Sequence, residues 1–298
     1  MGGGGAAGGW RLSVEDLGVR GQERQDGGMI WELKETIKAA MLFDGWRETM
    51  IWSCLQGVMG KIYVDSLEKP VSAMAVLGDF VFLAGEPERE FIDRKKSETN
   101  GCGPDTAQRP GERGGSRIIV PRDEGWAKLI EECLGDRAKK TVRYAIKKEP
   151  DVFDRERLQR IVDRLPGGYE LNMIDEELFK RCSEEEWSSS WVEQYKEYDT
   201  YRRYGLGVVM LKDGEPVSGA SSYTGYIGGI EVQIDTREDY RRRGLALICG
   251  AKLILECLRR GWYPSWDAQN RWSVGLAEKL GYHFDHEYAA YVVADSTI

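Results

Sequence analysis

The sequence predicts an α/β protein whose 298 residues form two units, each with several short strands and flanking helices. Two observations support this prediction. Short runs rich in β-branched and aromatic residues alternate with segments whose apolar residues recur at three-and-four spacing. The order of these elements over residues 60–146 is also similar to the order over residues 207–293. Two similar folds in tandem would explain this similarity. The alternative is coincidence, since strands and helices alternate in many α/β chains.

The first unit is expected to span residues 29–150. It follows a glycine-rich segment, residues 1–28, which cannot bury enough apolar surface to offset its ordering entropy and is therefore expected to be a disordered tail. Glycine and proline in residues 95–117 predict a surface insertion. The remaining elements expected here are a helix over 31–44, strands over 60–65, 71–77, 80–84 and 118–120, a helix around 126–133, and a strand over 141–146.

The second unit is expected to span residues 151–298. A charged helical region over 175–204 carries an aromatic face, and its spacing favours a helix packed on the core over a wall for a cationic substrate. The other expected elements are helices over 154–165, 244–260 and 271–280, and strands over 169–174, 207–211, 216–223, 229–235, 263–268 and 282–293.

Composition excludes several classes of function. Apolar residues make up 41% and charged residues 31%, the balance of a globular protein, and no apolar run is long enough to span a membrane. The net charge of -8 argues against a nucleic-acid partner. Six scattered cysteines and the missing secretory leader favour a cytoplasmic location. With two histidines, His283 and His286, a metal site is not expected.

The most informative segment runs from Gly229 to Ala246, where a strand leads through a turn into an apolar helix with the pattern Arg241-x-x-Gly244-x-Ala246. The first amides of a helix have no internal partner, and the helix dipole is positive at that end. Together they form a pocket suited to a pyrophosphate. Small residues let phosphate oxygens approach the backbone, and the neighbouring arginines add positive charge.

This segment resembles the acyl-CoA pyrophosphate motif of GNAT N-acetyltransferases, [Q/R]-x-x-G-x-[G/A]. The segment from Asn270 through Leu276-Ala277-Glu278-Lys279-Leu280-Gly281-Tyr282 is similar to the second CoA-side motif of the family. The resemblance covers about residues 169–293. It implies a mixed, mostly antiparallel GNAT sheet with helices on both faces, preceded by a smaller, degenerate GNAT-like domain. The whole chain also resembles a bacterial subfamily related to zwittermicin-resistance-type acetyltransferases.

The resemblance implies that acetyl-CoA (coenzyme A) is the co-substrate and that it lies where the strands over 229–235 and 263–268 separate. Strand backbone would pair with the pantetheine arm, the turn would hold the pyrophosphate, and two further residues would touch the arm from the other side. The residues implied in cofactor binding are Val232, Gln233, Ile234, Arg241, Arg242, Arg243, Gly244, Leu245, Ala246, Asn270 and Ser273.

The expected reaction is attack of a small-molecule amine on the thioester, which requires a base. Glu231 is the first candidate for the base and Asp267 the second, although each also fits a paired structural carboxylate. A backbone N–H near Val232 would meet the oxyanion. The usual tyrosine acid of the family is replaced by Ala277, for which Tyr223, Tyr226 or Tyr288 could substitute.

The missing tyrosine also motivates a second interpretation, that of a non-catalytic acyl-CoA sensor or structural GNAT-like protein. The sequence names neither the amine acceptor nor the acyl chain length, and it leaves open whether the chain pairs as a homodimer.

Overall fold

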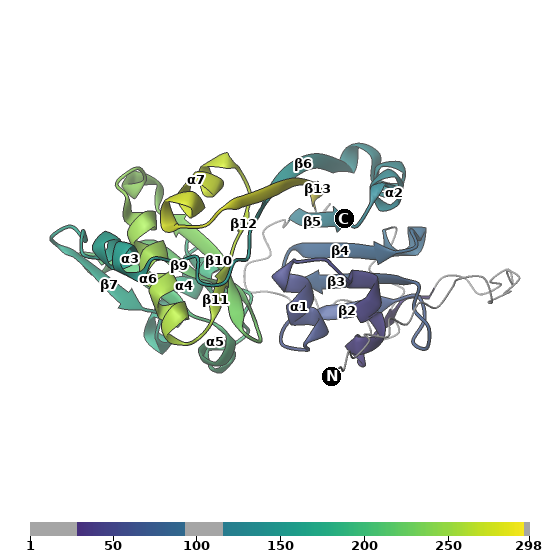
Figure 1. Ribbon diagram of the computed structural model, residues 1–298, viewed down its shortest axis with the longest axis horizontal. Coiled ribbons are helices and arrows are strands. Elements are labelled where there is room, and N and C mark those ends of the chain that lie inside the picture. The colour runs from purple at the N-terminus through teal and green to yellow at the C-terminus, as the bar shows by residue number, and fades with distance from the viewer. Residues whose placement is uncertain (1–28, 93–115, 295–298) are drawn as a thin grey trace, which may run out of the picture.

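A computed structural model of the chain describes residues 29–92 and 116–294 (Figure 1). The predicted tail lies outside the described residues, as does nearly all of the predicted insertion. Figure 1 shows an N-terminal lobe and a C-terminal lobe side by side, each built around one β-sheet. The predicted α/β fold with mixed, mostly antiparallel sheets is confirmed.

The sheet of the N-terminal lobe, here the first sheet, has the strand order β1-β2-β3-β4-β5-β13-β6-β12. Its strands are β1 (Trp31–Glu32), β2 (Lys61–Val64), β3 (Ser72–Leu77), β4 (Phe80–Gly85), β5 (Ser116–Pro121), β6 (Ala138–Ile146), β12 (Asp267–Ala268) and β13 (Phe284–Ala294). The helices of this lobe are α1 (Thr49–Leu55) and α2 (Glu124–Leu134), with the 3₁₀ helices η1 (Thr36–Phe43), η2 (Arg89–Phe91) and η3 (Gly135–Arg137).

The expected helix over 31–44 is wrong in its first part. Trp31 and Glu32 pair with Val64 and Tyr63 at the edge of the first sheet. Sheet hydrogen bonding therefore takes up the backbone there, and the helical turns begin only at Thr36.

The sheet of the C-terminal lobe, here the second sheet, has the strand order β11-β10-β9-β8-β7. Its strands are β7 (Tyr169–Met173), β8 (Gly207–Lys212), β9 (Glu215–Tyr226), β10 (Gly229–Thr236) and β11 (Tyr263–Ser265). The helices of this lobe are α3 (Arg155–Val162), α4 (Glu176–Glu184), α5 (Tyr198–Tyr204), α6 (Leu245–Arg259) and α7 (Arg271–Leu280), with the 3₁₀ helices η4 (Ser189–Trp191) and η5 (Glu238–Tyr240).

Both faces of the second sheet are covered. Val208 belongs to the apolar cluster that contains α3 and α6, whereas its neighbour Val209 packs with the aromatic residues Trp191, Tyr195 and Tyr201. Successive side chains of a strand point to opposite faces of the sheet. A strand that is covered on both faces therefore has apolar residues at consecutive positions. The expectation that the aromatic residues of 175–204 pack on the core is confirmed for these three, which are buried.

Strand membership does not follow the predicted boundary at residue 150. β13 leaves the C-terminal lobe and enters the first sheet between β5 and β6 (Figure 1). Its register with β6 runs from Phe284↔Ile146 to Val293↔Ala138, and β12 pairs with β6 as well. Pairing on both sides satisfies the backbone of β13. The expected last strand of the second unit therefore belongs to the first sheet, and the domain limits remain a prediction.

The two sheets repeat one pattern of strand directions. In the first, antiparallel β2, β3 and β4 are followed by β5, which is parallel to β4. In the second, antiparallel β8, β9 and β10 are followed by β11, which is parallel to β10. This correspondence supports the interpretation of two similar folds in tandem.

Candidate active site

The turn between β10 and α6 is open to solvent. Arg241, Arg242, Arg243 and Gly244 are exposed, and Gly244 adopts a φ of +78°, a left-handed conformation that favours glycine. A Cβ atom built on Gly244 would meet no atom within 4 Å. No side chain caps the helix, so its first amides have no side-chain acceptor at the helix N-terminus. The turn is therefore open, and its contact with a pyrophosphate stays a prediction.

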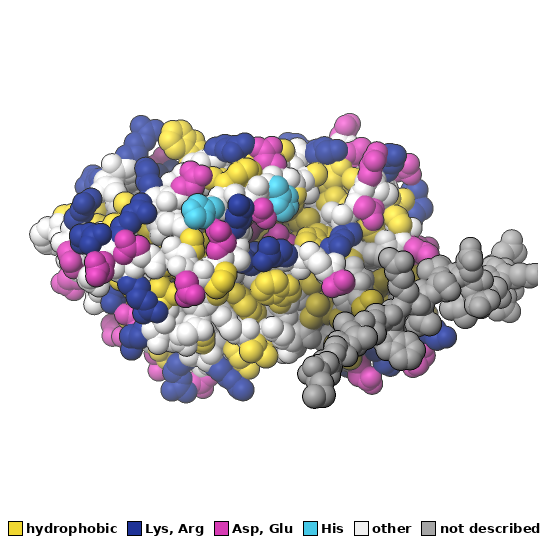
Figure 2. Space-filling view, in the orientation of Figure 1, with side chains coloured by type: hydrophobic (Ala, Val, Ile, Leu, Met, Phe, Trp, Pro, Cys, Tyr) yellow, Lys and Arg dark blue, Asp and Glu magenta, His cyan; other side chains and the backbone are white. Residues whose placement is uncertain are grey.

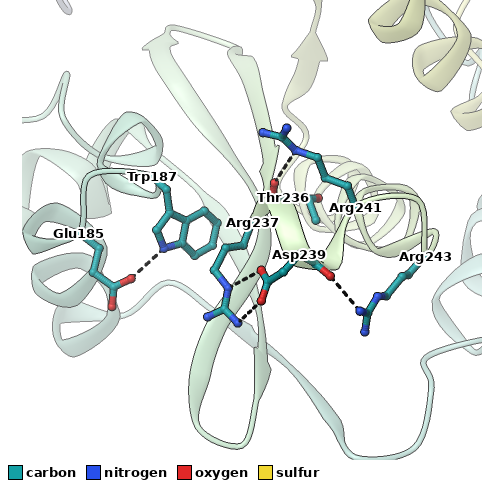
Figure 3. A network of polar contacts seen from close by, with 7 residues as sticks. All are labelled: Glu185, Trp187, Thr236, Arg237, Asp239, Arg241 and Arg243. Atoms are coloured by element: carbon teal, nitrogen blue, oxygen red, sulfur yellow. Dashed lines mark hydrogen bonds and ion pairs between the residues drawn. The ribbon is translucent and has the colours of Figure 1, made fainter.

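The arginines of this turn also hold its shape (Figure 3). The Arg241 Nε donates to the carbonyl of Thr236 at 3.2 Å, and an Arg243 Nη donates to the carbonyl of Asp239 at 2.8 Å. Arg237 pairs with the Asp239 carboxylate through two hydrogen bonds of 2.8 and 3.0 Å. A structural role for Arg241 and Arg243 is thus present beside the predicted binding role.

β10 separates from β11 within the second sheet. The parallel ladder comprises Gly229↔Tyr263, Ile230↔Pro264 and Glu231↔Ser265, and no later pair occurs among the described residues. On its other side β10 stays paired with β9 as far as Thr236, with a register shift between Glu231 and Val232. The edge of β10 over residues 232–236 is therefore left unpaired where the sequence predicted a slot, and it carries Val232, Gln233 and Ile234.

Asn270 and Ser273 lie at the start of α7. The Asn270 Oδ1 accepts a hydrogen bond from the Ser273 amide at 2.9 Å, which caps the helix. The Ser273 hydroxyl accepts from the Trp266 indole at 3.0 Å. Both side chains thus have structural partners, and their contact with the pantetheine arm stays a prediction.

Glu231 is buried at the point where the two strands separate, with 3% of its surface exposed. The Thr49 hydroxyl donates a hydrogen bond to its Oε2. Its Oε1 is buried and has no hydrogen-bond partner among the described residues. Burial raises the pKa of Glu231 to about 7, an effect that the positive charge of Lys148 opposes. A carboxylate with this pKa can exchange a proton near neutral pH.

Asp267, the second candidate, is held in an ion pair. The Arg143 Nε donates to its Oδ2 at 2.6 Å, and the Tyr288 hydroxyl donates to its Oδ1 at 2.8 Å. With both oxygens engaged and a cation beside it, Asp267 resembles a paired structural carboxylate. The geometry therefore favours Glu231 over Asp267 as the base.

Glu48 is a further candidate residue of this site that was not predicted from the sequence. It precedes α1 in the N-terminal lobe, and 7% of its surface is exposed. Burial, reinforced by the negative charge of Asp267, raises the pKa of Glu48 to about 8, and Glu231 acts in the same direction. A glutamate at the start of a helix is common, and no local pattern indicates which distant strand that helix contacts.

α1 itself packs on the second sheet and so brings Glu48 and Thr49 to Glu231. The Ser53 hydroxyl donates to the Gly225 carbonyl at 2.6 Å, and Trp52 packs edge-on against Tyr226 with ring centroids 5.8 Å apart. The N-terminal lobe therefore contributes to the carboxyl cluster formed by Glu48, Glu231 and Asp267.

The three tyrosines that could serve as the general acid in place of the usual tyrosine all form hydrogen bonds through their hydroxyl groups. The Tyr223 hydroxyl accepts from the Asp79 amide at 3.0 Å, the Tyr226 hydroxyl shares a 3.0 Å hydrogen bond with Ser265, and Tyr288 donates to Asp267. Burial raises the pKa of Tyr226 and of Tyr288. Ala277 is fully buried in the apolar core. None of these residues is singled out as a general acid.

Two further findings concern metal binding and membrane-spanning helices. Among the described residues, no group of three His, Cys, Asp or Glu side chains is placed to hold a metal ion. Within the same residues, no helix has both the length and the apolar character needed to cross a membrane.

Known proteins share this architecture. The chain is 44% identical to a GCN5-related N-acetyltransferase-like protein from Streptococcus suis 89/1591, whose crystal structure matches with a TM-score of 0.77 over 87% of this chain and 98% of that one. It is 27% identical over 265 residues to YdfB, an uncharacterized N-acetyltransferase of Bacillus subtilis strain 168, covering 84% and 92% of the two chains. A tandem GNAT protein from the clavulanic acid biosynthesis pathway shares the fold at 13% identity, with a TM-score of 0.50 over 91% and 100%.

The separated parallel strands, the open turn and these similarities define the class of the protein, an acyltransferase. A model of the GNAT acetyltransferase family matches residues 40–291, so the chain belongs to that family. The narrower resemblance to zwittermicin-resistance-type acetyltransferases stays a prediction.

Proposed function

We propose that this N-acetyltransferase transfers an acetyl group from acetyl-CoA to the amine of a small molecule. The observation that supports the proposal most is the end of the β10–β11 ladder at a buried glutamate with an unpartnered oxygen. A reacting amine placed there would meet a carboxylate whose pKa of about 7 suits proton transfer. The cytoplasmic location expected from the sequence belongs to this proposal.

The residues present fit acetyl-CoA. The turn at residues 241–246 offers helix amides and exposed arginines to a pyrophosphate, and the unpaired edge of β10 offers backbone groups to an extended pantetheine arm. When bound, acetyl-CoA supplies an activated acyl carbon in a thioester. Val232, which follows the register shift, is the residue whose N–H we expect to meet the acyl oxygen.

Glu231 would take the proton of the acceptor ammonium. The amine nitrogen then bonds to the acyl carbon as the carbon–sulfur bond breaks, and the nitrogen loses its second surplus proton. The coenzyme A thiolate takes up one proton, and one proton is released to solvent when Glu231 ionises again. Thr49 holds one oxygen of Glu231, which leaves the other for the proton. Burial excludes bulk water from the carboxylate and so keeps its pKa near neutrality.

The test is release of free thiol from acetyl-CoA with a panel of small amines. We expect release that depends on an amine and on the wild-type chain. Saturable acetyl-CoA binding in a calorimeter, without release for any amine, would instead indicate the sensor. Absence of binding heat with acetyl-CoA would contradict the assignment of the open turn.

A further inference from the structure

A cavity of about 300 Å³ lies beside β5, β6 and β13 of the first sheet, and it reaches the carboxyl cluster at Glu48. Arg47 and Glu48 line it from the segment before α1, Lys148 from the segment after β6, and His286 and Tyr288 from β13. Figure 2 shows histidine, basic and acidic side chains close together over the middle of the face in view. The cavity is thus adjacent to the proposed reaction centre and is built from both ends of the chain.

The positively charged side chains around this cavity differ in their hydrogen bonding. Arg122 donates to the Asp44 carbonyl at 2.7 Å and lies over the Trp46 ring at 5.1 Å. The side chains of Lys148 and Arg47, in contrast, form no hydrogen bond or ion pair with any of the described residues. Lys148 is half-buried and close enough to Glu48 and Glu231 for its charge to lower the pKa of each. Two cations whose side chains lack hydrogen-bond partners among the described residues therefore line the cavity together with Glu48.

We infer that this cavity binds the acceptor, and that the acceptor is a small amine that also carries an anionic group. The inference rests on the proposed function and names its substrate class. Glu48 receives the amine end, and Lys148 together with Arg47 receives a carboxylate or phosphate. Both anions offer oxygens to ammonium and guanidinium donors.

Other amines fit these charges less well. A polyamine would bring a second positive charge towards Lys148 and Arg47, which like charges oppose. A neutral amine would leave both cations without a partner. The volume of about 300 Å³ lies at the small end of ligand pockets, which suits a molecule the size of an amino acid.

The first experiment compares matched acceptors on the full chain at saturating acetyl-CoA. Alanine is paired with alaninamide, and phosphoethanolamine with ethanolamine, with cadaverine as a diamine. We expect kcat/KM from thiol release to be at least about tenfold higher for the anionic member of a pair, as charge-assisted hydrogen bonds predict. The pair with the larger ratio distinguishes carboxylate from phosphate.

The second experiment removes the cations one at a time. Lys148→Gln and Arg47→Gln should each lower the ratio of kcat/KM for the anionic acceptor to kcat/KM for its neutral counterpart about tenfold. The ratio is the readout because Lys148 also affects the pKa of Glu231, which changes the use of both acceptors alike. Lys147→Gln is the matched control, because Lys147 is exposed and does not line the cavity. Calorimetric titration of the anionic acceptor into protein saturated with coenzyme A measures acceptor affinity without turnover. The affinity should be lower in both variants than in the wild type.

Three outcomes would overturn the inference. Equal or better use of alaninamide, ethanolamine or cadaverine would refute the acceptor class and leave the transferase function intact. An equal loss for charged and neutral acceptors in Lys148→Gln would refute anion binding by that residue. No thiol release with any amine would refute the proposed function and this inference together.

Discussion

The two pairs of parallel strands occupy corresponding places in the two sheets and end differently. The β4–β5 ladder continues through Leu83↔Pro121, and its β4 residues are apolar and buried. The β10–β11 ladder stops at Glu231↔Ser265 and leaves a buried carboxyl at the break. The same succession of strands therefore gives a closed core in one lobe and an accessible strand edge in the other. The candidate site lies where backbone pairing stops.

The segments that follow the first strand of each pair differ as well. After β4 the described residues contain the short helix η2 before the segment 93–115, whereas β10 leads through the Gly244 turn into α6. If binding and catalysis both belong to the second sheet, substitutions at its strand break and at its turn should dominate activity.

Substitution of the carboxyl at the strand break should have the largest effect. Glu231→Gln removes the proton acceptor, so kcat should fall about hundredfold or more, with acetyl-CoA affinity retained. Glu170→Gln is the control, because Glu170 lies exposed on β7 of the same sheet. Steady-state thiol release gives kcat. A loss of less than about threefold would show that Glu231 is not the base.

Substitution at the turn should come next. Gly244→Glu places a negative charge at the proposed pyrophosphate position, so the Kd for acetyl-CoA should rise at least about tenfold by calorimetry. Gly214→Glu is matched, because Gly214 has a φ of +81° and the same open space around its Cβ, but lies in the β8–β9 hairpin. Equal affinity of the two variants for acetyl-CoA would show that the turn at Gly244 is not part of the cofactor site.

Stability should depend on pH through the buried carboxyl groups. The folded-state pKa values of Glu231 and Glu48, about 7 and about 8, exceed the ordinary value of 4.5, so the folded chain binds more protons between those limits. The free energy of unfolding should therefore fall as pH rises from about 4.5 to about 8.

Urea unfolding measured across this pH range tests that fall. In Glu48→Gln, residue 48 cannot ionise. The free energy of unfolding of this variant should therefore fall less between pH 5 and pH 8 than that of the wild type. Glu170→Gln should follow the wild-type curve, and an unchanged slope in Glu48→Gln would contradict the burial argument.

The smallest expected effect concerns the contact between the lobes. Thr49→Val removes the hydroxyl that donates to Glu231, and because that hydrogen bond favours the ionised form, the pKa of Glu231 should rise. The acidic limb of the pH profile of kcat/KM should move up by about one unit. A profile that moves down or stays fixed would show that Thr49 does not tune Glu231.

Local patterns in the sequence predicted the turn at Gly244, the strand that carries Glu231 and most helices, because each depends on residues close together in the chain. They did not predict that β13 enters the first sheet, since strand periodicity records which side chains are buried and not which strand is the partner. Glu48 was missed for the same reason, because its role depends on α1 packing on the second sheet. The ion pair of Arg143 with Asp267 was not predicted either, because the two residues lie 124 positions apart in the sequence.

The position of β13 has a consequence for how the protein is made. β5 and β6 leave the ribosome long before Phe284, which follows Ile146 by 138 positions and is its partner in the sheet. Until that late segment arrives, facing edges of β5 and β6 lack the strand that separates them, and unpaired edges invite association with other chains. Contacts between such distant residues are slow to form. We therefore expect the first sheet to reach its final arrangement only after β13 has been synthesised, although most of its strands are made much earlier.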